Sequence, residues 1–188
     1  MSVVGVGLLY PKRETNVGSA YRSCHIFDVD LIELIGARFT YQASDTTRAY
    51  RNIPLIVTND LIIPYDCIPI AVEITEDAIP LPKFNHPRNA FYIFGPEDGS
   101  VPDKILGGCR WTITIPGQFC LNLACAVTAV LYDRASKQDT YTMPVIKNYN
   151  KFNLDEALKT LAEETRRPGK AFREPGPSPY DLSARRKK

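Results

Sequence analysis

Several residue types and patterns that would point to particular functions are scarce or missing in this sequence of 188 residues. It has only two histidines, His25 and His86, which excludes a His-rich metal site and argues against a His-based catalytic triad. The five cysteines are odd in number and include no C-x-x-C pair, so they indicate reduced thiols. No G-x-x-x-x-G-K-[ST] phosphate loop occurs. We therefore expect no bound metal.

Strong charge of one sign and long apolar runs are also missing. The net charge of +2 is too small to indicate nucleic-acid binding by itself. The opening stretch MSVVGVGLLY has no basic region before its apolar run, and that run is too short to cross a membrane. We expect a cytoplasmic protein without a membrane partner.

Basic residues are concentrated at the end of the chain. Residues 166–188 contain eight Lys or Arg against two acidic residues, with four prolines among them. This composition cannot form a core, so residues 168–188 are predicted to be a basic, Pro-rich, disordered tail. It either keeps the protein soluble or contacts the phosphates of a nucleic acid.

The rest of the chain alternates strand-like and helix-like segments. Apolar runs predict strands at 3–10, 31–37, 68–75, 89–95 and 109–117, with a further short strand in IPLIVTNDL. Helical spacing predicts helices at 16–27, 44–50, 120–133 and 153–165. Repeated β-α units indicate an α/β fold with a mostly parallel sheet and helices on both faces. The domain is expected to span residues 1–150, followed by a C-terminal helix in 151–167.

Three of these strands end in glycine-bearing turns, with the sequences TNVGSAYR, FGPEDGSVP and IPGQFCLNLA. If the strands are parallel, all three loops emerge at the carboxyl edge of the sheet, where ligands bind. The glycines would permit close approach of a ligand or a strained backbone. Any single loop could be an ordinary turn, and the GVG at residues 5–7 lies inside the first strand, which makes it a poor dinucleotide motif.

The three motifs N-x-G-x-x-x-R (residues 16–22), F-G-P-E-D-G (94–99) and I-P-G…L-N-L-A-C-A (115–126) resemble, in order, those of the SpoU/TrmH branch of the SPOUT RNA methyltransferases. The resemblance covers roughly residues 3–135. It implies a homodimer that transfers a methyl group from S-adenosylmethionine to a ribose 2′-hydroxyl of tRNA or rRNA. It also implies a deep C-terminal trefoil knot, which chain-topology rules alone would not predict.

The resemblance implies catalytic roles for Arg22, Asn16, Glu97 and Asn122. A ribose hydroxyl is a weak nucleophile, and the fixed charge of Arg22 would stabilise the developing alkoxide, while guanidinium is a poor proton acceptor. Asn16 is expected to orient Arg22 or to bind the ribose. Glu97 is expected to support Arg22 or the dimer contact. A surface ion pair is the structural alternative for Arg22.

The second and third motifs are expected to form the cofactor pocket, together with the end of the strand at 68–75. The implied cofactor-binding residues are Val72, Glu73, Phe94, Gly95, Glu97, Gly99, Ile115, Gly117, Leu121, Asn122 and Ala124.

Two positions depart from the family pattern. Cys120 stands where the family usually has serine, which puts the rate or the substrate choice in doubt, and Gly117 stands where many relatives carry methionine. Residues 1–15 leave no room for a separate RNA-binding domain before the first motif, which favours tRNA over rRNA. Two alternatives stay open: methylation of a base nitrogen, and a non-catalytic RNA-binding module that kept the fold.

Overall fold

The computed structural model describes residues 2–38 and 53–138, which lie within one compact unit, Met1–Thr142. The helices expected at 44–50 and 153–165, the domain boundary at 150, the segment 151–167 and the tail 168–188 lie outside the described residues. No helix in the described ranges has the length and apolar character needed to cross a membrane. The same ranges contain no cluster of three or more His, Cys, Asp or Glu side chains that could hold a metal ion.

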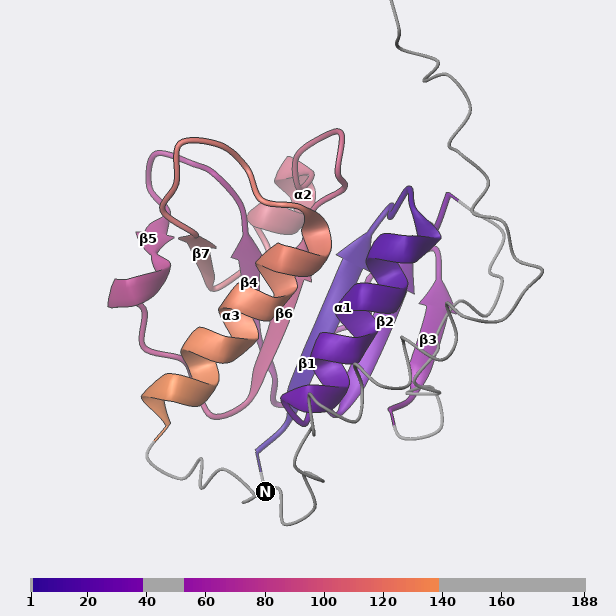
Figure 1. The fold of residues 1–188 in the computed structure, drawn as a ribbon, viewed down its shortest axis with the longest axis horizontal. Coiled ribbons are helices and arrows are strands. Elements are labelled where there is room, and N and C mark those ends of the chain that lie inside the picture. The colour runs from indigo at the N-terminus through magenta and orange to yellow at the C-terminus, as the bar shows by residue number, and fades with distance from the viewer. Residues whose placement is uncertain (1, 39–52, 139–188) are drawn as a thin grey trace, which may run out of the picture. The chain divides into compact units, whose positions relative to one another are not determined.

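The described chain forms a seven-stranded, entirely parallel sheet in the order β3-β2-β1-β6-β4-β7-β5 (Figure 1). Its elements in chain order are β1 (Val4–Leu9), α1 (Glu14–Ile26), β2 (Leu31–Ile35), β3 (Leu55–Thr58), β4 (Ile68–Val72), β5 (Ile79–Pro80), the 3₁₀ turn η2 (Leu81–Lys83), β6 (Ala90–Phe94), α2 (Asp103–Leu106), β7 (Trp111–Thr114) and α3 (Leu123–Lys137). The expected parallel α/β sheet is confirmed.

The centre of the sheet is the pair β1 and β6, whose residues are all buried. Both strands are nearly continuous apolar runs, as strands covered on both faces should be. A Cβ on Gly5 would lie 2.4 Å from the ring of Phe91, and one on Gly7 would lie 2.8 Å from it. The GVG segment therefore makes room for a core aromatic ring in the neighbouring strand.

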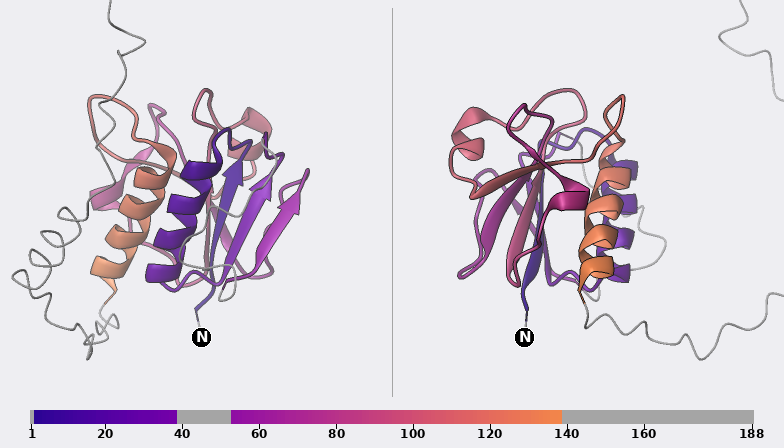
Figure 2. Two further views of the ribbon diagram at one scale, coloured as in Figure 1. Left: turned by 45° about the vertical axis from the view of Figure 1, so that its right-hand side comes forward. Right: turned by 90° about the vertical axis from the view of Figure 1, so that its left-hand side faces the viewer.

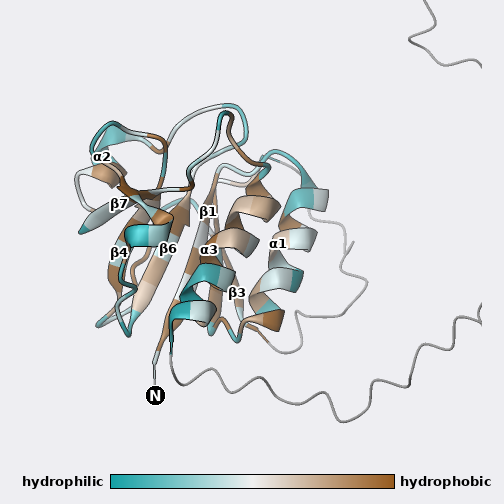
Figure 3. Cartoon of the chain, turned by 60° about the vertical axis from the view of Figure 1, so that its left-hand side comes forward, coloured by the Kyte–Doolittle hydropathy of each residue, from teal (hydrophilic) through white to brown (hydrophobic). Residues whose placement is uncertain are grey.

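The two faces of the sheet are covered by different kinds of structure. Helices α1 and α3 pack side by side on one face, and the short helix α2 lies on the other (Figure 2, right). The hydroxyls of Ser23 in α1 and Thr128 in α3 are 2.6 Å apart, so small residues let these helices approach closely. The first half of α3 is largely hydrophobic and its last turns are hydrophilic (Figure 3).

Several element boundaries differ from the predicted ones, and a cap explains one of them. Helix α3 begins at Leu123 because Asn122 is its N-cap, with the Asn122 side chain accepting a hydrogen bond from the amide of Ala124. Residues 120–122, expected to be helical, therefore belong to the loop. Helix α1 begins two residues before Asn16, and the strand expected at 109–117 is confined to β7.

The polar link carrying the sequence KFNHPR is tied to the end of α3 by buried side chains. Arg134, 5% exposed, donates to the backbone carbonyls of Pro87 and Arg88. The His86 ring lies 2.9 Å from a carboxylate oxygen of Asp133 and 2.5 Å from the hydroxyl of Tyr92. Burial lowers the pKa of His86, although the bond to Asp133 opposes this shift.

Candidate functional site

The three motif loops follow β1, β6 and β7, and they leave the sheet at its carboxyl edge because all three strands are parallel. Strand order places β1 beside β6, and β4 between β6 and β7. From β1 the chain adds β2 and then β3 on one side. It next forms β4, which lies on the opposite side of β1, beyond β6. The loops thus surround the point where strand order reverses, which is where open α/β sheets bind ligands.

A chain of hydrogen bonds joins one residue from each motif. The Asn122 amide nitrogen donates to the side-chain oxygen of Asn16 at 3.0 Å. The Asn16 amide nitrogen donates in turn to Glu97 Oε1 at 2.7 Å. The other carboxylate oxygen, Oε2, accepts from the backbone amide of Lys12 at 2.9 Å. Three of the four expected catalytic residues therefore form one connected network.

The charge of Glu97 is stabilised by this network. Burial opposes the charged form, but the hydrogen bonds from Asn16 and from the Lys12 amide outweigh it, and the pKa of Glu97 is lowered. Glu97 is therefore ionised at neutral pH. It acts as a fixed acceptor that holds the first and second motif loops together, and it is poorly suited to donate a proton.

The adjacent Asp98 also joins loops. Its carboxylate accepts two hydrogen bonds from the Arg38 guanidinium, at 2.6 and 3.2 Å, and pairs with Lys12 Nζ at 3.2 Å. The hydrogen bond from Arg38, followed by that from Lys12, lowers the pKa of Asp98 to about 2. The loops after β1, β2 and β6 are thus connected at the surface by charged groups.

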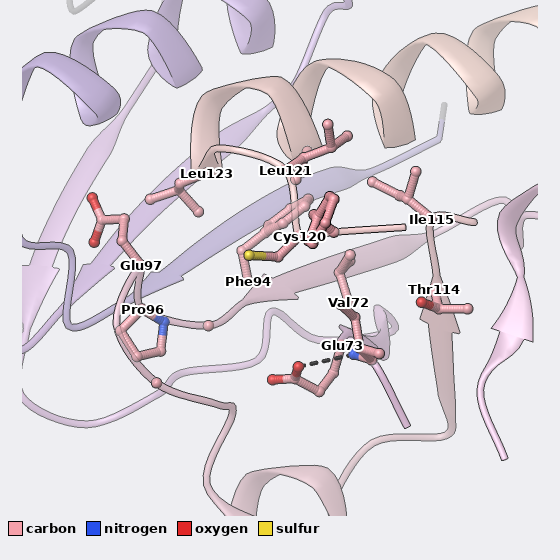
Figure 4. Close-up of a pocket in the computed structure, with 15 residues that line it drawn as sticks. Val72, Glu73, Phe94, Pro96, Glu97, Thr114, Ile115, Cys120, Leu121 and Leu123 are labelled. Carbon is pink, nitrogen blue, oxygen red and sulfur yellow. Dashed lines mark hydrogen bonds between the residues drawn. The ribbon is translucent and has the colours of Figure 1, made fainter. Parts of the chain in front are cut away.

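A cavity of about 140 Å³ lies between the second and third motif loops and the end of β4 (Figure 4). Eight of the eleven expected cofactor residues line it: Val72, Glu73, Phe94, Gly95, Glu97, Gly99, Ile115 and Leu121. The sequence analysis missed the other lining residues, which are Ile74, Pro96, Thr114, Phe119, Cys120, Leu123 and Ala126. Most of these adjoin predicted ones, and helical spacing from Leu123 would have indicated Ala126.

Three expected cofactor residues do not line this cavity. Ala124 is buried in the main core, 7% exposed. Asn122 is used as the N-cap of α3 and as the partner of Asn16. Gly117 lies exposed in the loop before Cys120. Asn122 and Ala124 are adjacent in sequence to the lining residue Leu123, and the start of α3 turns them away from the cavity.

Glu73 fixes the shape of the second motif loop from inside the cavity. Its Oε2 accepts from the backbone amide of Val101 at 2.7 Å. Its Oε1 accepts from the backbone amide of Ile74 at 2.8 Å (Figure 4). Gly95 is packed against the same contact, because a Cβ there would lie 3.2 Å from the Val101 amide nitrogen and 3.5 Å from Glu73 Oε2. The loop is therefore closed against the end of β4 by a carboxylate.

The motif glycines are not needed for a left-handed backbone. Within the described residues, Gly36 is the one glycine with positive φ. The strained turns considered for Gly95, Gly99 and Gly117 are therefore wrong, and close packing accounts for Gly95 alone. A Cβ on Gly99 would meet only Pro96, at 3.4 Å.

Arg22 stands apart from the network. It is exposed on α1, lines no part of the cavity, and has no hydrogen-bond or ion-pair partner among the described residues. Of the roles expected for Asn16 and Glu97, a contact with Arg22 is not found among the described residues; the ribose contact of Asn16 and the dimer contact of Glu97 stay predictions. Asn16 and Arg22 are six positions apart, so they project from different sides of the helix. The surface ion pair considered for Arg22 is also not found in the described part of the chain.

Cys120 lines the cavity on the side of the third motif loop (Figure 4). The residue is exposed and forms no disulfide. The position where serine is usual in the family pattern therefore borders the site, and here it carries a weak hydrogen-bonding group.

Comparison with known proteins identifies the family and similar folds. The profile of the SpoU rRNA Methylase family matches residues 4–132. No curated protein sequence matches the chain.

Solved structures with similar folds include the SpoU methyltransferase AviRb from Streptomyces viridochromogenes in complex with AdoMet, at TM-score 0.63 and 19% identity, covering 71% of this chain and 59% of that one. The A. aeolicus TrmH/SpoU tRNA modifying enzyme matches at TM-score 0.63 and 16% identity, covering 89% of this chain and 91% of that one. A structure described for 2-OH methylation of C/U34 on tRNA matches at TM-score 0.62 and 20% identity, covering 72% of this chain and 91% of that one. The chain thus spans about three fifths of the length of the Streptomyces protein.

Proposed function

Because the chain belongs to the SpoU rRNA Methylase family of RNA methyltransferases, we propose that it transfers a methyl group from S-adenosylmethionine to a ribose 2′-hydroxyl, with tRNA favoured over rRNA. The observation that carries the proposal is the Asn16–Glu97–Asn122 network, which joins all three motifs beside the cavity. The similar structure associated with 2-OH methylation of tRNA supports the choice of the ribose hydroxyl.

The cavity residues fit such a cofactor chemically. Val72, Phe94 and Ile115 supply apolar surface for the adenine, and Glu73 supplies a carboxylate that can accept hydrogen bonds from ribose hydroxyls or the amino group. The enclosed volume of about 140 Å³ is below the several hundred Å³ typical of ligand sites, so part of the ligand would extend to the open mouth. The bound cofactor supplies a sulfonium methyl group that needs little activation.

The side chains of this protein would then act on the hydroxyl and on the geometry of the loops. Glu97 stays charged and, through Asn16, keeps the first and third motif loops in register. Arg22 stabilises the alkoxide that develops on the ribose, since a guanidinium remains protonated. The proton leaves to a substrate phosphate or to water, because no residue of the network is a suitable base.

The position of Arg22 favours a homodimer. An exposed Arg22 that lies outside its own cavity can serve the reaction if it reaches the cavity of a second copy. Exposed apolar side chains on α3 and in the loop before it support an interface: Phe119 is 86% exposed, Leu121 50% and Tyr132 63%. The small residues of α3 give little support to an interface, because Thr128 already packs against α1 of the same chain.

Two alternatives make different predictions. A base-nitrogen methyltransferase would bind the same cofactor but leave ribose hydroxyls unmodified, and an RNA-binding module would not transfer the methyl group. The Asn16–Glu97–Asn122 network favours an enzyme, because an RNA-binding module has no need for it.

The test combines calorimetry with S-adenosylmethionine and transfer of a labelled methyl group to total tRNA and rRNA, followed by mapping of 2′-O-methyl sites. We expect binding and 2′-O-methylation of tRNA. Label found on a base, or binding without transfer to either RNA, would replace the proposal with one of the alternatives.

A further inference from the structure

A second and larger cavity, of about 380 Å³, lies on the other face of the sheet, and its lining runs from the carboxyl ends of β1, β2 and β6 to Pro69 in β4 and Cys109 before β7. Its apolar lining includes Ile35, Ile63, Ile93 and Ile105, which belong to the core cluster on the α2 side. This is the face opposite α1 and α3 (Figure 2, right). The volume falls within the range of small-molecule sites, and the family motifs do not account for it.

The wall formed by residues 59–63 is held in place by a buried glutamate side chain. Glu33, 1% exposed, accepts hydrogen bonds to both carboxylate oxygens from the Ile62 amide, at 3.1 and 3.3 Å. Burial raises the pKa of Glu33, and the bond from Ile62 opposes this shift. The Thr58 hydroxyl closes a turn with the backbone of Asp60, at 3.1 Å to its nitrogen and to its oxygen. Burying a carboxylate to order one loop indicates a preformed wall.

The opposite side of the mouth carries an aromatic ring in a strained backbone. Tyr10 has φ 46, a left-handed conformation that is rare for a bulky residue. Its amide donates to Ile35, its carbonyl accepts from Arg38 Nε at 2.8 Å, and its ring lies over Gly36, where a Cβ would approach to 2.6 Å. Strain that the surroundings hold in place is typical of ligand sites.

The polar groups at the mouth define the chemistry of a ligand. Asn59, Asp60 and Lys104 line the cavity, and their side chains have no partner among the described residues. The amide of Asn59 and the carboxylate of Asp60, from consecutive residues of this wall, together match the edge of a nucleobase that carries an exocyclic amino group. Isoleucine walls and a tyrosine suit its flat faces, and Lys104 suits a phosphate.

We propose that this second cavity binds an amino-bearing nucleobase: adenine, cytosine or guanine. Uracil fits poorly, because its two carbonyls flank its N–H and would face the Asp60 carboxylate. This inference rests on the proposed function for its biological source, an RNA nucleotide near the methylated one. Gly95, Pro96, Glu97 and Gly99 line the first cavity, and Pro102 and Ile105 line the second, so one segment separates the two sites.

The test is an NMR titration of the full chain with the four nucleoside 5′-monophosphates and with ribose 5-phosphate. Amides of residues 59–63 and 104–109 report on the second cavity, and those of 95–99 report on the first. AMP, CMP and GMP should shift the second set more than UMP does, and ribose 5-phosphate, which lacks the base, should leave residues 59–63 unshifted and at most shift amides near Lys104. Replacing both Asn59 and Asp60 by alanine should weaken this binding by at least about tenfold.

The matched control replaces two exposed residues without described partners, Asp77 and Asn85, by alanine, and should bind as the parent does. A short single-stranded RNA that displaces the nucleotides identifies RNA as the source, and failure to displace identifies a free nucleotide. The proposal is overturned if no nucleotide shifts residues 59–63, if ribose 5-phosphate shifts them equally, or if the Asn59/Asp60 variant binds like the parent. Methyl transfer is not used in this readout, so the proposed function stands or fails separately.

Discussion

Replacing Gly95 by alanine should damage the first cavity through one specific contact. The new Cβ would lie 3.2 Å from both the amide nitrogen and a side-chain methyl of Val101. A side chain could move away, but this amide is held by Glu73 at 2.7 Å, so relief requires the backbone of the loop to shift. The shift would lengthen the hydrogen bond that closes the loop against β4.

The size of the effect follows from these contacts. Overpacking of this kind costs about 1–3 kcal/mol, and weakening a bond to a charged carboxylate falls in the same range. We expect the free energy of unfolding to fall by about 1–2 kcal/mol, because loop movement relieves part of the strain. Displacement of the cavity wall should raise the dissociation constant of S-adenosylmethionine roughly tenfold, equivalent to about 1.4 kcal/mol.

Calorimetry with S-adenosylmethionine and urea unfolding measure the two quantities. Gly117→Ala is the matched control: it adds the same methyl group to an exposed glycine that does not line the cavity, where the Cβ would meet only the carbonyl oxygen of Phe119 at 3.4 Å. The control should unfold and bind like the parent. If Gly95→Ala binds the cofactor with parental affinity, the Glu73–Val101 contact does not shape the binding site and the reasoning fails.

Other features of the molecule give four further predictions. Arg22→Ala and Arg22→Lys should bind S-adenosylmethionine normally but lose on the order of a hundredfold in single-turnover methylation at saturating RNA; parental rates would make Arg22 structural. Light scattering should give about twice the chain mass, and an active monomer would contradict the dimer. Since burial lowers the pKa of His86, the unfolded state binds its proton first, and the free energy of unfolding should fall as pH drops below about 6.5. This slope should disappear in His86→Phe and persist in His25→Ala. Removing residues 169–188 should weaken RNA binding and flatten its salt dependence, whereas unchanged binding would leave solubility as the role of that segment.

Apolar pattern and strand ends were sufficient to predict the sheet and the location of the first cavity. Runs such as those of β1 and β6 are buried on both faces, so composition alone identifies them. Parallel strands then bring their following loops to one edge. This is why most cavity-lining residues could be named from the three motifs and the end of β4.

The partners of individual polar side chains could not be predicted in the same way. Asn16 was expected to orient Arg22, a neighbour in its own motif, or to bind the ribose, but its partners within the described chain are Glu97 and Asn122, far away in sequence. His86 was placed in a polar link, yet it lies in a buried network with Asp133. Such contacts depend on which loops meet after folding, and one sequence does not specify that pairing.

The second cavity was not foreseen at all. Its walls come from the ends of three strands, the link after β3, and α2, and these contain no motif. Glu33 gave a possible signal, as the one acidic residue inside the apolar run LIELI of β2. An ionisable group in a strand expected to be buried needs a polar partner, and that partner is the loop that forms the cavity wall.

The pairing of β1 with β6 has a consequence for synthesis of the chain on the ribosome. β1 can pair with β2 and pack against α1 early, but its other edge must wait for β6, because Val4 pairs with Ala90. At about 5–20 residues per second, several seconds pass before β6 has been made. During that interval the nascent chain presents an apolar strand with a row of unpaired backbone groups, a template for aggregation. A chaperone that binds extended apolar segments would have its greatest effect on yield in that interval.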